Sequence, residues 1–212
     1  MFEYPFAYIT EIGSRMWGMA TPTSDSDREY VYIVPTRDIL SGRYPGHRVV
    51  AKKFVEDGVQ VDAQFKEIGH IITQLIKGNI NAVWSVTTPN VIAGTAGFRQ
   101  LRRVTLANLS KHIYPSIHGY ATAMIRDADR VTEPVALRKR RRAAYRIANQ
   151  GVELFSVGKI RYQPAPDEVT PAMLNEILIA LADAYATTDL PDTGDADAFH
   201  EFLYDVRMGE LW

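Results

Sequence analysis

The sequence predicts an α+β fold, with a small mixed β-sheet in the N-terminal half and a helical bundle in the C-terminal half. Two observations support this prediction. Short runs of β-branched and aromatic residues, separated by Gly, Pro, Ser and Asp, dominate the first part of the chain and are typical of strands and turns. Beyond residue 97 the apolar residues recur at the spacing of amphipathic helices. We therefore expect two parts, a core over residues 1–97 and a helical region over residues 98–212 with an acidic C-terminal segment.

Four runs predict the strands of the sheet. Residues 7–12 end at Gly13, and residues 30–34 end before Pro35. Residues 49–55 and 59–63 flank Glu56-Asp57-Gly58, and an Asp-Gly pair between two apolar runs is typical of a β-hairpin. We expect the third and fourth strands to pair.

Helical spacing begins at Phe65 and continues through Leu75 and Ile76, and Gly78-Asn79 is a stop signal. Further helices are predicted over residues 101–109, 117–128 and 136–157, from Thr170-Pro171 to residue 186, and from Asp197 onwards. Thr170 is a good N-cap, and Pro171 suits the first helical position. Residues 187–196 are small, acidic and rich in turn formers, which predicts a linker.

Charge is unevenly distributed along the chain, although 24 Lys and Arg nearly balance 25 Asp and Glu. Residues 1–97 carry 9 basic and 10 acidic side chains, residues 98–162 carry 14 and 4, and residues 163–212 carry 1 and 11. The basic middle segment is suited to phosphate-rich ligands. The acidic segment either folds back onto it or solubilises the protein.

The absence of cysteine excludes a disulfide framework and a thiolate nucleophile. No basic segment followed by an apolar stretch opens the chain, and no apolar run reaches about 18 residues. We therefore expect a cytoplasmic protein with no membrane partner.

The stretch from Gly13 to Asp27 carries the most chemical information. If Asp25 and Asp27 begin a strand, their carboxylates share one face, where paired negative charge is unfavourable unless a divalent cation neutralises it. Gly13 permits close approach of the backbone to a ligand, and Ser14 with the following amides at the start of a short helix predicts a phosphate cradle. The alternative for Asp25 and Asp27 is a solvated turn with Asx caps.

This arrangement resembles the minimal nucleotidyltransferases of the DNA polymerase β superfamily, in which a strand ends in Gly-Ser and an Asp-x-Asp pair follows. Here ten residues separate Gly13-Ser14 from Asp25-Ser26-Asp27. The longer pattern Gly-Ser-Arg-x-Trp-Gly-x-Ala-Thr-Pro-x-Ser-Asp-x-Asp, followed by Val-Tyr-Ile, resembles the RNA-ligase-associated branch of predicted nucleotidyltransferases. The resemblance extends through Lys77-Gly78-Asn79 and the long basic helix to Gly158, and so covers most of the chain.

The resemblance implies a nucleotidyltransferase core that uses two Mg²⁺ ions to transfer a nucleoside monophosphate from a nucleoside triphosphate, such as ATP, to a hydroxyl acceptor. It implies that Asp25 and Asp27 bridge both ions. A third carboxylate on a neighbouring strand matches Asp62, which would bind one ion, so these three residues are the expected catalytic and metal ligands. The alternative for Asp62 is the N-cap of a helix that follows a strand.

The resemblance also implies nucleotide-binding residues in two places. Gly13, Ser14 and Arg15 belong to the first motif. On the long helix, Lys139 and Arg146 are seven residues apart and share a face, and Arg142 lies one turn from either. The basic run over residues 138–142 is otherwise a solvated helix face or a non-specific nucleic-acid patch.

Four positions depart from the family pattern. Ser26 and Arg28 stand where the superfamily prefers apolar residues. Ile80 stands where relatives have the Pro of an Asn-Pro-x-x-x-Glu segment, and Trp84 stands where they have its Glu. The branch implies an RNA end as acceptor, and a protein acceptor, as in AMPylation, is the alternative within the same chemistry. Trp84 is the main support for a different class, a regulatory or binding protein that keeps the fold without turnover.

Overall fold

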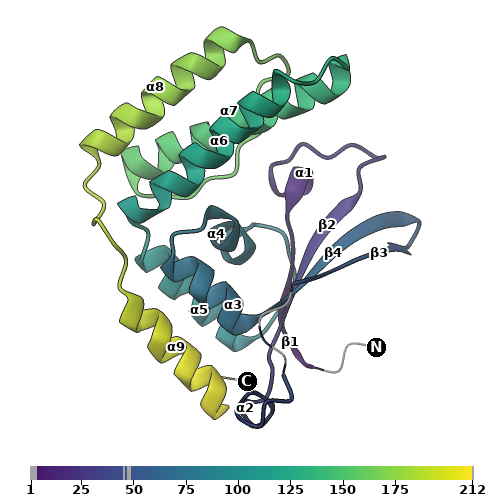
Figure 1. The fold of residues 1–212 in the computed structure, drawn as a ribbon, viewed down its shortest axis with the longest axis vertical. Helices are drawn as coiled ribbons and strands as arrows, with labels where there is room; N and C mark the ends of the chain where they lie inside the picture. Colours follow the sequence, from purple (N-terminus) through teal and green to yellow (C-terminus); the bar gives the residue numbers. More distant parts are fainter. Residues whose placement is uncertain (1–3, 45, 47–48, 212) are drawn as a thin grey trace. The chain divides into compact units, whose positions relative to one another are not determined.

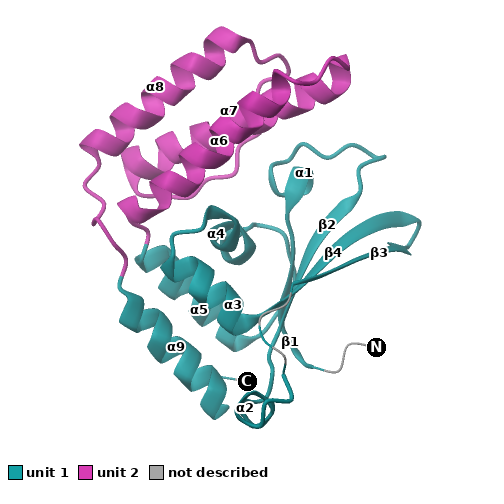
Figure 2. Ribbon diagram, viewed as in Figure 1, with its two compact units in different colours: residues 1–108, 195–212 teal, residues 109–194 magenta. Residues whose placement is uncertain are grey.

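The computed structural model describes residues 4–44, 46 and 49–211, and it divides into two compact units (Figure 2). Unit 1 comprises residues 1–108 and 195–212, and unit 2 comprises residues 109–194. The sequence predicts a boundary near residue 97 with all of residues 98–212 in the helical region, but unit 1 continues to residue 108 and also includes residues 195–212. Unit 1 extends past residue 97 because the helix after residue 95 buries Phe98 and Leu101 against it, with the Phe98 ring 4.5 Å from that of Tyr8.

A five-stranded mixed sheet forms one layer of unit 1, in the order β3-β4-β2-β1-β5. Strands β2 and β4 are parallel, and the other neighbours are antiparallel. The strands are β1 (Phe6–Glu11), β2 (Ser26–Tyr32), β3 (Val50–Glu56), β4 (Val59–Glu67) and β5 (Val91–Gly94). The α+β prediction and its four strands are confirmed, whereas the sequence did not predict β5.

The expected hairpin joins β3 and β4. Its turn residues Asp57 and Gly58 have φ angles of 49° and 78°, the left-handed conformation that a tight hairpin turn requires. This turn fixes the register, so Lys53 is the Cα partner of Asp62.

Helices α3, α4 and α5 cover one face of this sheet (Figure 1). The helices of unit 1 are α1 (Gly13–Met16), α2 (Thr36–Leu40), α3 (Ile68–Ile76), α4 (Ile80–Thr87), α5 (Ala96–Ala107) and α9 (Ala196–Met208). The prediction that α3 begins at Phe65 was wrong. Phe65 remains in β4, where its ring stacks on Tyr30 at 4.8 Å, and the helix begins only after Glu67, whose side chain accepts a hydrogen bond of 2.6 Å from the Gly69 amide.

Unit 2 is helical, as the sequence predicts. It contains the 3₁₀ turn η1 (Lys111–Ile113) and helices α6 (Tyr114–Ala128), α7 (Pro134–Val157) and α8 (Pro171–Thr187). Thr170 caps α8, and Gly158 ends α7 in the left-handed conformation. Within α7, Gly151 permits close packing, because a Cβ there would lie 2.5 Å from Leu181 and 2.9 Å from Ile117.

Among the described residues, none of the helices combines the length and the apolar character that a membrane crossing requires.

Candidate active site

Three carboxylates converge on the sheet of unit 1. Asp27 in β2 and Asp62 in β4 are Cα partners across the parallel pair, and Asp25 precedes β2 by one residue. One oxygen from each of the three lies within 4.8 Å of the others, and all three residues are half-buried. Asp62 lies inside β4 and the following helix is capped by Glu67, so the N-cap alternative for Asp62 is excluded.

The donor set of this acidic cluster (Asp25, Asp27 and Asp62) fits a divalent cation. Carboxylate oxygens are the ligands that hard cations such as Mg²⁺ and Mn²⁺ prefer. Three negative charges at this separation repel one another unless positive charge lies among them. The predicted metal ligands are therefore brought together by strand register.

The protein itself supplies one cation to the cluster. The Lys53 ammonium lies 2.6 Å from Asp62 Oδ2, and the Gln60 amide donates to Asp62 Oδ1 at 3.2 Å. The hydrogen bond from Lys53 and then that from Gln60 lower the pKa of Asp62. The same bond, the charge of Asp62 and weaker effects of Asp25 and Asp27 raise the pKa of Lys53. Sequence reasoning missed Lys53, although the Asp57-Gly58 turn sets the register that pairs it with Asp62.

Gly13 lies directly against Asp27. Its φ is +65°, and a Cβ built there would overlap the Asp27 carboxylate, with Cγ only 2.8 Å away. The Ile12 amide donates to the Asp27 carbonyl at 2.8 Å and holds the two segments together. The Gly13-Ser14 start of α1 thus lies beside the acidic cluster, as the motif predicts.

Arg15 contacts the backbone that leads into β2. Its guanidinium donates to the Ser24 carbonyl at 3.0 Å and to the Asp25 carbonyl at 3.3 Å, and its Nε lies 3.4 Å from a Glu11 carboxylate oxygen. We expected Arg15 to bind nucleotide. In the structure these contacts hold Asp25 at the start of the strand.

The two polar departures within β2 have a structural explanation. Ser26 and Arg28 alternate with Asp25 and Asp27 and so point to the opposite face of the sheet. There Ser26 Oγ donates to Glu11 at 2.5 Å, and Arg28 donates to Ser26 Oγ at 3.0 Å and pairs with Glu56. This polar network replaces the apolar packing expected at these positions and leaves the acidic face unchanged.

Trp84 lies in the core of unit 1. It is 7% exposed, Trp17 is 2% exposed, and their rings meet edge to face with centroids 5.6 Å apart. Trp17, which follows α1, is therefore a packing residue. The indole of Trp84 fills space beside Trp17, and the three carboxylates converge despite the loss of the family's Glu.

The basic residues predicted from α7 belong to unit 2. Lys139 is exposed, and Arg146 is half-buried. Arg142 donates to the Ala165 carbonyl at 3.2 Å and lies 3.4 Å from an Asp167 carboxylate oxygen. A nucleotide-binding role for these three residues stays a prediction.

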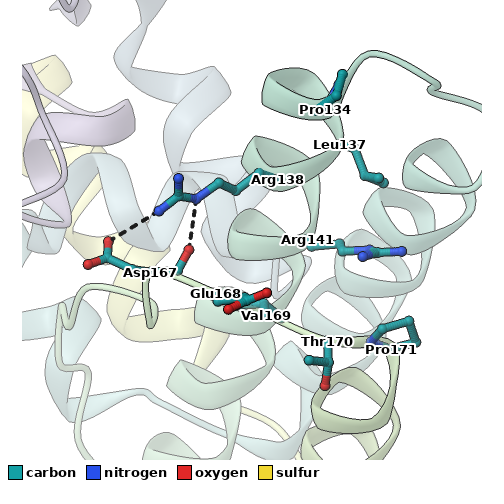
Figure 3. Close-up of a pocket in the computed structure, with 9 residues that line it drawn as sticks. All are labelled: Pro134, Leu137, Arg138, Arg141, Asp167, Glu168, Val169, Thr170 and Pro171. Atoms are coloured by element: carbon teal, nitrogen blue, oxygen red, sulfur yellow. Dashed lines mark hydrogen bonds and ion pairs between the residues drawn. The ribbon is translucent and has the colours of Figure 1, made fainter.

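Unit 2 also contains a cavity of about 520 Å³ between the first turns of α7 and the start of α8 (Figure 3). Arg138 crosses toward Asp167, donating to its carbonyl at 2.8 Å. Arg141 lines the cavity and makes no ion pair among the described residues. Its lining is Pro134, Leu137, Arg138, Arg141, Asp167, Glu168, Val169, Thr170 and Pro171.

Residues 2–160 match the family model described as the RNA repair pathway DNA polymerase beta family, RlaP. The chain belongs to this family. Membership in RlaP confirms the assignment to the polymerase β superfamily of nucleotidyltransferases. A nucleotidyltransferase-like protein from Exiguobacterium sibiricum 255-15 is a structural match, with 12% identity, a TM-score of 0.37, and coverage of 98% of this chain and 75% of that chain. No significant match is found among curated proteins.

Proposed function

We propose that this protein is a Mg²⁺-dependent nucleotidyltransferase that transfers a nucleoside monophosphate from a nucleoside triphosphate to the hydroxyl of an RNA end. The observation that carries the proposal is the convergence of Asp25, Asp27 and Asp62 within 4.8 Å on adjacent strands of a polymerase β-type fold. Membership in a nucleotidyltransferase family supports the reaction class.

In the proposed reaction the acceptor oxygen attacks the α-phosphorus, the α–β phosphoanhydride bond breaks, and pyrophosphate leaves while the hydroxyl proton passes to solvent. Divalent cations, when bound, supply positive charge to the triphosphate and lower the pKa of the acceptor hydroxyl. Asp25 and Asp27 would hold both cations, and Asp62 would hold the one beside the acceptor. Gly13 lies against Asp27, and Gly13 and Ser14 at the start of α1 would bind the triphosphate.

The test is label transfer from each α-labelled nucleoside triphosphate in the presence of Mg²⁺, with and without RNA. Asp25→Asn and Asp27→Asn should each lower the rate at least about 100-fold, because each removes a ligand that stabilises charge in the transition state. Asp57→Asn is the matched control, since Asp57 is exposed in the hairpin turn and Asn tolerates its positive φ. Label transfer that is independent of both aspartates would contradict the proposal.

Two observations support RNA as the acceptor. The family model carries the description of an RNA repair pathway. In unit 2, Lys139 and Arg141 carry no acidic partner among the described residues, whereas Arg138, Arg140 and Arg142 lie within 4.0 Å of aspartates. Cations without acidic partners are free to contact a phosphate backbone.

Arg141→Ala tests this acceptor class. It should weaken binding of single-stranded RNA and reduce the slope of log K against log salt by about one, as loss of one phosphate contact does. Arg161→Ala is the control, because Arg161 already pairs with Glu153 at 3.2 Å. Absence of RNA binding at low salt, together with label transfer to protein, would favour a protein acceptor instead.

The regulatory alternative predicts neither label transfer nor Mg²⁺-dependent nucleotide binding. Its main support was Trp84, but this side chain packs in the core against Trp17 while the acidic cluster is complete. The arrangement of carboxylates therefore favours the enzyme.

A further inference from the structure

We propose that Lys53 is a positioning residue that holds Asp62 in the metal-free protein and sets the affinity of the acidic cluster for divalent cations. This inference rests on the proposed function, because it concerns the same three carboxylates. The inference gives the edge strand β3, which carries no residue of the sequence motifs, a role in the site.

The geometry places Lys53, Asp62 and Asp27 in one row across β3, β4 and β2. Lys53 is the Cα partner of Asp62, and Asp62 is the Cα partner of Asp27. Directly opposed residues of neighbouring strands share a face, so the three side chains meet. Both Asp62 oxygens are engaged, Oδ2 by Lys53 at 2.6 Å and Oδ1 by Gln60 at 3.2 Å.

Electrostatics makes Lys53 a competitor of the metal. The ammonium takes one oxygen of the carboxylate that would bind a cation, and it offsets part of the repulsion among the three acids. A divalent cation that binds Asp62 Oδ2 competes with this hydrogen bond, and it lies near a positive charge. The Lys53 side chain is 71% exposed and has a flexible stem, so it can leave Asp62 without disturbing the sheet.

Lys52 provides a matched control on the same strand. It points to the opposite face, where its ammonium lies 5.5 Å from the centroid of the Phe65 ring. Lys52→Met and Lys53→Met remove the same charge from adjacent positions. Only Lys53→Met removes the contact with Asp62.

The experiment measures Mn²⁺ affinity by calorimetry and the rise in Tm on addition of Mg²⁺, for the full chain and both variants. Lys53→Met should bind Mn²⁺ about 10-fold more tightly than Lys52→Met, because only Lys53→Met frees the Asp62 carboxylate from an ammonium that competes with the metal. In the presence of a chelator the Tm of Lys53→Met should fall below that of Lys52→Met, because the repulsion among the three carboxylates is no longer offset. Addition of Mg²⁺ should restore the Tm. Lys53→Arg keeps the charge and should return the affinity toward that of the unmodified protein.

A double-mutant cycle with Asp62→Asn tests whether Lys53 changes the Mn²⁺ affinity through its contact with Asp62. If Lys53 acts through Asp62, the gain from Lys53→Met should disappear in the Asp62→Asn background. Equal Mn²⁺ affinity of Lys53→Met and Lys52→Met would overturn this inference and leave the proposed function intact. Absence of Mn²⁺ binding by the unmodified protein and all variants would overturn both.

Discussion

At the scale of single residues, two glycines, Gly13 and Gly18, have the same backbone φ but different surroundings. Gly13 and Gly18 both have φ of +65°, but a Cβ on Gly13 meets the Asp27 carboxylate, whereas nothing lies within 4 Å of a Cβ on Gly18. Backbone conformation explains both glycines. Close approach to the acidic cluster explains only Gly13.

Gly13→Ala should therefore displace Asp27 and reduce Mn²⁺ affinity and nucleotidyl transfer at least about 10-fold, as expected when a metal ligand is misplaced. Gly18→Ala should lose about 1–2 kcal/mol of stability from the left-handed strain alone and keep metal binding. Calorimetry with Mn²⁺ and thermal unfolding of both variants check the pair. Equal loss of metal binding in both would show that only the strain matters.

The site was predictable where a motif lies within one continuous segment. Asp25, Asp27 and Gly13 follow from the spacing of a single strand and turn, and Asp62 follows from the resemblance. The contact of Lys53 with Asp62 depends on hairpin register, which a motif does not describe. The hydrogen bonds from Arg15 to the Ser24 and Asp25 carbonyls depend on the path of the loop before β2, which the sequence does not show.

At the scale of helices and strands, α4 and β5 were missed because neither has one buried and one exposed face, the asymmetry that produces a periodic sequence pattern. Helix α4 is buried at seven of its eight residues, so it shows no alternation between apolar and polar faces. Strand β5 has four residues and all are exposed, so it lacks both length and a buried face. By contrast, α7 and α8 were predictable because their ends carry Gly158, Thr170 and Pro171, which specify termini locally.

The buried position of Trp84 in α4 predicts how a Glu at this position would affect stability. Trp84→Glu should destabilise unit 1 by about 3–5 kcal/mol, because it removes a buried indole beside Trp17 and introduces a carboxylate into the core. Trp84→Phe keeps an apolar ring and should cost clearly less. Urea unfolding of the two variants measures the difference. Similar midpoints would show that this position tolerates the carboxylate.

At the scale of the whole molecule, helix α9 returns to unit 1 and completes it. Arg207 donates to the buried Glu67 carboxylate at 2.6 Å and to the Val34 carbonyl at 2.9 Å, while Thr36 Oγ1 donates to the Arg207 carbonyl at 2.6 Å. The acidic segment is thus divided, since Asp167 pairs with α7 inside unit 2 and α9 packs on α3 and α5.

Arg207→Met should destabilise unit 1 by about 3–5 kcal/mol, because Glu67 is fully buried and would be left without its cation. Amide hydrogen exchange in α3, which Glu67 caps, should accelerate together with exchange in α9. Arg99→Met, at an exposed position of α5, is the control. Unchanged protection of α3 in Arg207→Met would contradict this role.

Because α9 is the last helix of the chain, unit 1 can be completed only after unit 2 has been synthesised. Unit 2 is inserted between two segments of unit 1, and the Asp195 amide donates to the Asn108 side chain at 2.8 Å where the chain leaves and returns. A ribosome adding roughly 5–20 residues per second makes unit 2 for several seconds before α9 exists. During that interval the residues of the sheet and its three carboxylates have been synthesised, while Glu67 still lacks Arg207. Unit 2 can therefore fold before unit 1 is complete.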